Sequence, residues 1–225
     1  MRRADRVWLF DLDNTLHDAS AAAFAGINEG MTEYIERELA LDRAAADALR
    51  RHYWLRYGAT LLGLVRHHGV NAAHFLHHAH LLPGLEQRVQ GHRHDFAAIE
   101  RLHGRKFIVT NAPAQYTARV LGTLGVASLF DGVIAVEQMR MFGHRRPKPD
   151  TRMLRRLAVR LHARPSDCVL VEDTLGHLKA ARRVGMGTVW MQRFTRRARW
   201  GIAAGTRTSV VPAYVDRRVR RLSAL

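Results

Sequence analysis

The sequence predicts an α/β fold in which a Rossmann-like parallel sheet carries helices on both faces and a helical cap is inserted near the N-terminus. Two observations support this prediction. Short apolar runs alternate with amphipathic stretches along most of the 225 residues, a pattern typical of parallel strands joined by helical crossovers. In addition, nearly a hundred residues without a convincing strand separate the first apolar run from the second.

Five apolar segments are expected to be the buried strands. Each is bounded by Gly, Asp or Asn, and most are rich in β-branched or aromatic residues. The segments are RVWLF (6–10), KFIVT (106–110), GVIAV (132–136), CVLVE (168–172) and TVWM (188–191). The helices expected between the later strands cover 114–124, 150–162 and 174–184.

The long interval after the first strand reads as helical. Its periodic segments cover 21–40, 43–66 and 72–80, and a further helix at about 94–103 leads into the second strand. We therefore expect residues 17–90 to form the cap, with 1–16 and 91–225 as the core. An insertion after the carboxyl end of a strand lies over the crevice where open parallel sheets bind ligands, so this part is expected to act as a lid.

The composition limits the kinds of protein that fit. No apolar run reaches eighteen residues and the N-terminus lacks a signal-peptide pattern, so a cytoplasmic protein without a membrane partner is expected. The formal net charge is +16; three of the 36 basic residues are lysines and the other 33 are arginines. Residues 193–225 hold nine arginines, but no nucleic-acid motif accompanies them, which favours a solvated surface over a nucleic-acid partner. The sequence does not indicate an oligomeric state.

Polar and charged side chains follow four of the expected strands, at the point where each strand ends. The carboxyl ends of parallel strands meet at one edge of the sheet, so these side chains are expected to converge. They are Asp11, Asp13 and Thr15; Thr110 and Asn111; Lys148; and Glu172, Asp173 and Thr174.

Clustered carboxylates are tolerated when a cation neutralises them, and Mg²⁺ binds one or two carboxylates together with phosphate oxygens. Asp11 and Asp173 suit as such ligands. A carboxylate can also attack phosphorus, while a second acid two residues away handles the protons. Lys148, Thr110 and Asn111 would then offset the charge on a transferring phosphoryl group.

The ordered set DLDNT, TN, KP and ED resembles the four motifs of the haloacid dehalogenase superfamily, in its phosphatase branch, from residue 6 to about 192. The resemblance implies that Asp11 is the nucleophile, forming an aspartyl-phosphate, and that Asp13 is the general acid and base. It also implies Mg²⁺ held by Asp11, the Asp13 backbone carbonyl and Asp173, with phosphate bound by Thr110, Asn111 and Lys148. The helical insertion resembles the helical cap of that superfamily.

A narrower resemblance links FDLDNTLHDAS, RYGATLLGLVRHHGV and VEDTLGHLKAAR to the pyrimidine 5′-nucleotidase group. It implies hydrolysis of nucleoside monophosphates such as UMP and CMP. The alternatives are a phosphatase of another small metabolite, such as a sugar phosphate, and a basic nucleic-acid-binding protein on a disused core. Haloacid dehalogenation is disfavoured by Asp13, because that reaction needs no protonation of a leaving group.

Several residues fit the resemblance less closely. The fourth motif has Glu172 where an aspartate is usual, so Glu172 could contact the metal or a water bound to it. Asp18, beside His17, is also unusual for the group. His17 and Tyr57 are considered as substrate contacts from the cap. His74, His77 and His78 have a spacing that can bind a transition metal, but the pattern also fits a polar helix face, and we interpret it as compositional.

Overall fold

The computed structural model describes residues 6–194 and 210–225. The chain divides into two compact units. The α/β unit comprises residues 1–20 and 89–225, and the helical unit comprises residues 21–88. The short helix α1 (Ala19–Ala22) spans the first junction. Residues 17–20, which the sequence placed in the cap, therefore belong with the α/β unit.

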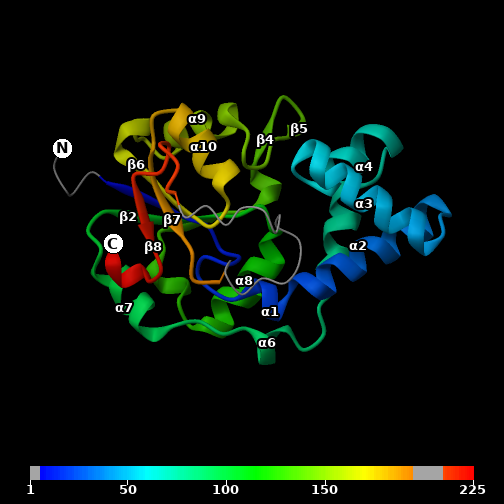
Figure 1. The fold of residues 1–225 in the computed structure, drawn as a ribbon, viewed down its shortest axis with the longest axis horizontal. Helices are drawn as coiled ribbons and strands as arrows, with labels where there is room; N and C mark the ends of the chain where they lie inside the picture. The colour runs from blue at the N-terminus through cyan, green and yellow to red at the C-terminus, as the bar shows by residue number, and fades with distance from the viewer. Residues whose placement is uncertain (1–5, 195–209) are drawn as a thin grey trace. The chain divides into compact units, whose positions relative to one another are not determined.

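The α/β unit is built on a six-stranded parallel sheet with strand order β3-β2-β1-β6-β7-β8 (Figure 1). Five strands correspond to the predicted apolar runs, and this confirms the α/β fold class. The strands are β1 (Val7–Phe10), β2 (Arg105–Val109), β3 (Gly132–Ile134), β6 (Cys168–Glu172), β7 (Gly187–Met191) and β8 (Arg217–Val219).

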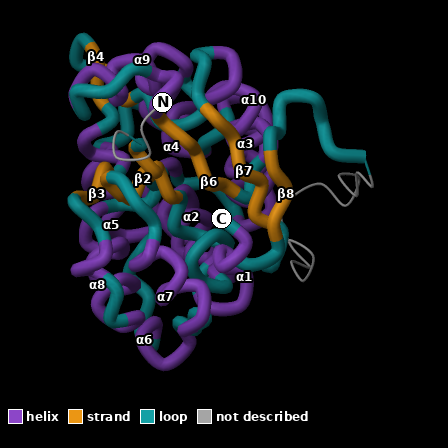
Figure 2. Tube along the Cα trace, turned by 90° about the vertical axis from the view of Figure 1, so that its left-hand side faces the viewer, coloured by secondary structure: helices purple, strands orange, loops and turns teal. Residues whose placement is uncertain are grey.

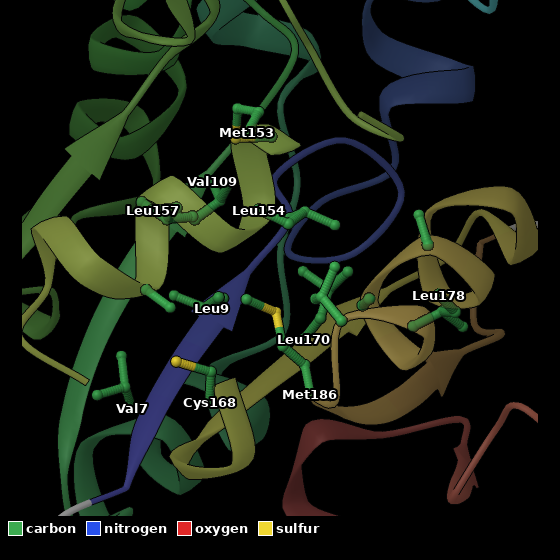
Figure 3. Packing of buried hydrophobic residues seen from close by; sticks show 14 of the residues in the cluster. Val7, Leu9, Val109, Met153, Leu154, Leu157, Cys168, Leu170, Leu178 and Met186 are labelled. Carbon is green, nitrogen blue, oxygen red and sulfur yellow. The ribbon is translucent and has the colours of Figure 1, made fainter. Parts of the chain in front are cut away.

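Helices cover both faces of this sheet. Figures 1 and 2 show α9 and α10 on one side, with α7 and α8 on the other. Their bounds are α7 (Arg93–Arg101), α8 (Ala114–Leu124), α9 (Thr151–Arg160) and α10 (Leu175–Arg183). In the core beneath α9 and α10, apolar side chains of the helices pack against Leu9 of β1 and Leu170 of β6 (Figure 3). Because β1 is buried on both faces, it reads as a continuous apolar run rather than an alternating one.

The helical unit contains the helices that the periodicity predicted, with one additional break. Its helices are α2 (Phe24–Leu39), α3 (Arg43–Tyr57), α4 (Thr60–His68), α5 (Ala72–Ala79) and α6 (Leu85–Arg88). The segment 43–66 was expected to be one helix, but α3 ends at Gly58, which has a φ of 77° and donates its N–H to the Trp54 carbonyl. Glycine adopts this left-handed conformation at little cost, so the chain turns there and α4 packs back against α3.

A small hairpin that the sequence did not predict lies between β3 and α9. Its strands are β4 (Arg140–Met141) and β5 (His144–Arg145), joined by Phe142 and Gly143. Both turn residues have positive φ, 51° and 79°, as the tight turns of two-residue hairpins require. The strands are too short to show a period, which explains why the pattern did not reveal them.

The C-terminal segment completes the sheet. Strand β8 pairs with β7, and the Asp216 carboxylate accepts the Thr188 N–H at 2.9 Å. Beyond β8, the buried carboxylate of Asp95 on α7 accepts the backbone N–H of Leu222 at 2.8 Å and pairs with Arg193 at 2.7 Å. Residues 210–225 are thus fixed to the α/β unit. The arginines between 195 and 209 lie outside the described residues.

Replacing Asp95 by alanine should lower the free energy of unfolding by about 2–3 kcal/mol. The change removes hydrogen bonds to a charged acceptor and leaves the buried N–H of Leu222 without its acceptor. Urea denaturation followed by circular dichroism measures the effect. Glu100→Ala, at an exposed position of the same helix, is the matched control and should change stability by less than about 0.5 kcal/mol. Equal stability of the two variants would contradict the role given to Asp95.

Candidate active site

The site begins where β1 ends. Asp11 is still held in the sheet, because its backbone N–H donates to the Val171 carbonyl of β6 at 2.9 Å. The chain then turns tightly: the Leu12 carbonyl accepts the N–H of both Thr15 and Leu16. The Thr15 hydroxyl donates to Asp11 Oδ2 at 3.3 Å. The turn therefore presents Asp11 at the carboxyl edge of the sheet, the edge at which parallel sheets bind ligands.

A buried lysine joins two carboxylates from neighbouring strands. Lys148 Nζ donates to Asp11 Oδ1 and to Glu172 Oε2, both at 2.7 Å, and the lysine side chain is only 1% exposed. His177 Nδ1 of α10 lies 2.9 Å from the same Glu172 oxygen. Lys148 thus links Asp11 and Glu172, which are far apart in sequence, into one chain of ion pairs. Their positions at the ends of strands predicted this convergence.

The protonation equilibria follow from burial and from these pairs. Burial and the neighbouring Glu172 raise the pKa of Asp11 to about 7, although Lys148 acts in the opposite direction. Burial also acts to raise the pKa of Glu172, but Lys148 and His177 outweigh it and hold that pKa well below its usual range. The two carboxylates in turn raise the pKa of Lys148 despite its burial. The lysine is therefore charged, and Glu172 is the more firmly ionised of its two partners.

Asp173 adds a third carboxylate to this edge. Burial, followed by the charges of Glu172 and Asp11, raises the pKa of Asp173 well above its ordinary value. The Trp190 indole donates to the Asp173 carbonyl at 3.0 Å and fixes the backbone there. The raised pKa values of Asp11 and Asp173 show that the site has too little positive charge to stabilise both ionised carboxylates. A bound cation would supply that charge.

Asp11, Glu172 and Asp173 could hold that cation. One ligand oxygen from each lies within 4.8 Å of the others, and in the described part of the chain this is the only such acidic or histidine cluster. Three buried oxygen ligands suit a hard divalent cation such as Mg²⁺. Glu172 is the less available ligand, because its Oε2 binds Lys148 and its Oε1 accepts the Thr174 N–H at 3.1 Å.

Asp13 lies in a separate hydrogen-bond cluster. Its Oδ1 accepts the hydroxyl of Tyr116 on α8 at 2.8 Å and lies 2.9 Å from His17 Nε2. His17 and Tyr116 are buried, whereas the Asp13 side chain remains 19% exposed. Burial, together with the negative charge of Asp13, raises the pKa of Tyr116 well above its usual value, so this hydroxyl is a permanent donor.

Thr110 and Asn111 shape the loop after β2. The Thr110 hydroxyl accepts the Ala112 N–H at 3.0 Å. The Asn111 side chain makes two reciprocal bonds of 2.9 Å with the backbone N–H and carbonyl of Lys148. In this structure the Asn111 side chain therefore holds the lysine loop in place, a role that the expected phosphate contact did not include.

Of the two residues expected to contact substrate from the cap, His17 belongs to the α/β unit and Tyr57 to the helical unit. His17 faces Asp13 within the α/β unit, because its backbone bridges to Asp13 and Gly91 fold it against the core. Tyr57 belongs to the helical unit, where its hydroxyl lies 2.6 Å from His67 Nε2. Of the three histidines on α5, His74 contacts the Tyr34 hydroxyl at 3.3 Å through Nδ1.

Besides His177, which pairs with Glu172, Tyr116 is a site residue that the sequence reasoning did not identify. It is 103 residues from Asp13, and it is one of the buried positions that give α8 its amphipathic period. A tyrosine on the apolar face of a helix is most often part of the core. Its position six residues after Thr110 was the only available signal.

The haloacid dehalogenase-like hydrolase family matches residues 6–185, so the chain belongs to that family. Solved structures share the fold. They include a HAD phosphatase from Thermococcus onnurineus (19% identity, TM-score 0.62, 96% of this chain and 94% of that chain). Another is an L-2-haloacid dehalogenase from Xanthobacter autotrophicus (16% identity, TM-score 0.55, 97% and 96%).

Two curated relatives are similar over shorter stretches. The chain is 32% identical over 93 residues to fructose-1-phosphate phosphatase YqaB of Escherichia coli, which covers 40% of this chain and 47% of that protein. It is 22% identical over 201 residues to phosphate metabolism protein 8 of Saccharomyces cerevisiae, which covers 83% and 61%. The chain thus spans less than two thirds of the length of either relative. In addition, no helix among the described residues is long and apolar enough to cross a membrane.

Proposed function

We propose that this hydrolase is a Mg²⁺-dependent phosphomonoesterase that acts through an aspartyl-phosphate on Asp11. The observation that carries the proposal is the placement of two acids with different surroundings at one sheet edge. Asp11 is buried and paired with Lys148, whereas Asp13 is partly exposed and contacts Tyr116 and His17. Two carboxylates in distinct environments suit a nucleophile and a proton carrier.

In the first half of the reaction, an Asp11 oxygen forms a bond to phosphorus while the ester P–O bond breaks. Asp13 gives its proton to the departing oxygen. In the second half, a water loses its proton to Asp13 and bonds to phosphorus, and the bond between Asp11 and phosphorus breaks. Lys148 stays charged throughout and offsets the negative charge of the transferring group.

The metal ligands in this proposal are Asp11, the backbone carbonyl of Asp13 and Asp173, with Glu172 beside them. When bound, Mg²⁺ supplies positive charge to the phosphoryl oxygens and relieves the repulsion among the buried carboxylates. Thr110 and Asn111 shape the phosphate pocket next to Lys148. The cluster of three buried oxygen ligands supports this arrangement.

For the substrate, we propose a small phosphorylated metabolite, with pyrimidine nucleoside monophosphates such as UMP and CMP as the leading class. The sequence resemblance described above supports that choice. The second candidate is a sugar phosphate, which the similarity to the Escherichia coli fructose-1-phosphate phosphatase favours. A role in nucleic-acid binding receives no support from the described residues beyond positive charge.

A phosphate-release assay with Mg²⁺ separates these candidates. The panel contains UMP, CMP, AMP, GMP, fructose 1-phosphate, other sugar phosphates and p-nitrophenyl phosphate. We expect the highest kcat/KM for UMP or CMP, by at least about tenfold over the purine nucleotides, because differential binding of 1.4 kcal/mol changes the ratio tenfold. A flat profile, or a preference for sugar phosphates, would reject the pyrimidine assignment while leaving the phosphatase assignment intact. No hydrolysis of any ester would reject both.

A further inference from the structure

We propose that Tyr116 and His17 are positioning residues that hold Asp13 so that its Oδ2 alone exchanges the proton. The inference rests on the proposed function and extends it to two residues outside the motifs. It starts from the convergence of two buried donors from different elements on one oxygen: Oδ1 of Asp13 lies 2.8 Å from the Tyr116 hydroxyl and 2.9 Å from His17 Nε2.

The surroundings of His17 determine its tautomer. Its Nδ1 is buried and has no hydrogen-bond partner in the described structure. A buried N–H without an acceptor is costlier than a bare ring nitrogen, which is a weak acceptor. The ring proton is therefore on Nε2, where it donates to Asp13.

The lone pairs of Asp13 Oδ1 limit where its proton can be. A carboxylate oxygen offers about two acceptor positions. Tyr116 and His17 occupy both positions on Oδ1, so a proton carried by Asp13 must be on Oδ2. The 19% exposure of the Asp13 side chain, beside neighbours that are buried, leaves the other end of the carboxylate available to a substrate.

Both residues that contact Asp13 Oδ1 belong to segments fixed within the α/β unit. The backbone of His17 makes bridges to Asp13 and to Gly91, and the Asp18 N–H donates to the Gln90 carbonyl at 3.4 Å. Tyr116 lies in the first turn of α8, directly after the Thr110–Asn111 loop. The side chains of His17 and Tyr116 therefore hold the Asp13 carboxylate in one orientation, because their own backbone segments are fixed to the α/β unit. This orientation fixes the direction of proton transfer, and a misplacement of about 1 Å in a catalytic group can lower a rate by about 10²-fold.

The step that the two residues support is protonation of the leaving oxygen. The proton moves from Oδ2 to the ester oxygen as the P–O bond breaks and the bond from Asp11 to phosphorus forms. A leaving group of low pKa departs without this help, whereas an alkoxide needs it. Because kcat/KM reports the reaction up to leaving-group departure, its dependence on the leaving-group pKa measures how well Asp13 acts as an acid.

The experiment compares kcat/KM for a series of aryl and alkyl phosphates, with Mg²⁺ present, in the wild type and in variants. Tyr116→Phe keeps the ring and loses the hydroxyl. His17→Leu removes the donor, while His17→Gln retains an amide N–H. Thr117→Val is the matched control, since it removes a buried hydroxyl bonded to the Pro113 carbonyl on the same helix.

We expect Tyr116→Phe and His17→Leu to lower kcat/KM for alkyl phosphates by about tenfold or more, and for p-nitrophenyl phosphate by less than about threefold, so that the slope against leaving-group pKa steepens. His17→Gln should fall between His17→Leu and the wild type. Thr117→Val should keep the wild-type slope. In an Asp13→Asn background, which has the steepest slope, Tyr116→Phe should have no further effect, because the group that it positions is gone.

The outcomes distinguish the positioning role of Tyr116 and His17 from the proposed phosphatase function. Equal losses for all esters in Tyr116→Phe, or an unchanged slope, would overturn the positioning role while leaving the phosphatase assignment in place. The same would follow if Tyr116→Phe lowered activity equally with and without Asp13, since this would indicate a purely structural effect. A wild type that hydrolyses none of the esters would overturn the proposed function and the positioning role together.

Discussion

Asp11→Asn should abolish phosphate release, lowering kcat by about 10⁴-fold or more, because an amide cannot form the bond to phosphorus that the carboxylate forms. The measurement is hydrolysis of p-nitrophenyl phosphate with Mg²⁺. Asp167→Asn is the matched control. Asp167 is also a buried aspartate, but it precedes β6 and so lies at the opposite edge of the sheet, where it pairs with Arg164. The Asp167→Asn variant should retain wild-type activity. Substantial activity in Asp11→Asn would refute the nucleophile assignment.

The loss in Asp11→Asn should not come from unfolding. Burial raises the pKa of Asp11 to about 7 from an ordinary value of 3.8, so folding disfavours its ionised form. The stability that the protonated acid contributes is fully present below pH 3.8 and is lost as the pH rises through about 7. Without metal, the asparagine variant should therefore gain stability relative to the wild type as the pH rises from 5 to 8. Urea denaturation at several pH values in EDTA measures this, and an opposite trend would contradict the unfavourable charge at Asp11.

Lys148→Met should lower the free energy of unfolding by about 3–5 kcal/mol in the absence of metal. The change removes the cation that pairs with both Asp11 and Glu172 and leaves their charges buried. It should also reduce kcat/KM strongly, because the transferring phosphoryl group loses a positive neighbour. Urea denaturation and the phosphate-release assay measure the two effects.

The control for this variant is Lys179→Met, which removes an exposed lysine from α10 and should change stability by less than about 0.5 kcal/mol. Adding Mg²⁺ should restore part of the stability lost in Lys148→Met, since ligand binding to the folded state stabilises it. If Lys148→Met were as stable as Lys179→Met, the buried ion pairs of Lys148 would not stabilise the fold.

The sequence pattern predicted five of the six strands of the sheet and the main site, for a definable reason. Strands buried on both faces appear in the sequence as apolar runs. The polar and charged side chains that follow these runs must lie at one edge of the parallel sheet. That logic brought Asp11, Lys148, Glu172 and Asp173 together in advance, and the structure agrees. It did not reveal β8, an edge strand in which Arg217 and Arg218 are exposed and Val219 is buried, because such a strand has no apolar run.

By itself, therefore, the sequence determined the fold class, the family and the acidic edge with its lysine, since these depend on local periodicity and on the order of the motifs. Only the tertiary structure decided which partners each group has. Asn111 holds Lys148, Asp95 fixes the C-terminus, and Tyr116 reaches Asp13 from a helix 103 residues away. Such contacts depend on how helices pack on a sheet, and a single side chain on a helix carries no mark of the residue that it will meet.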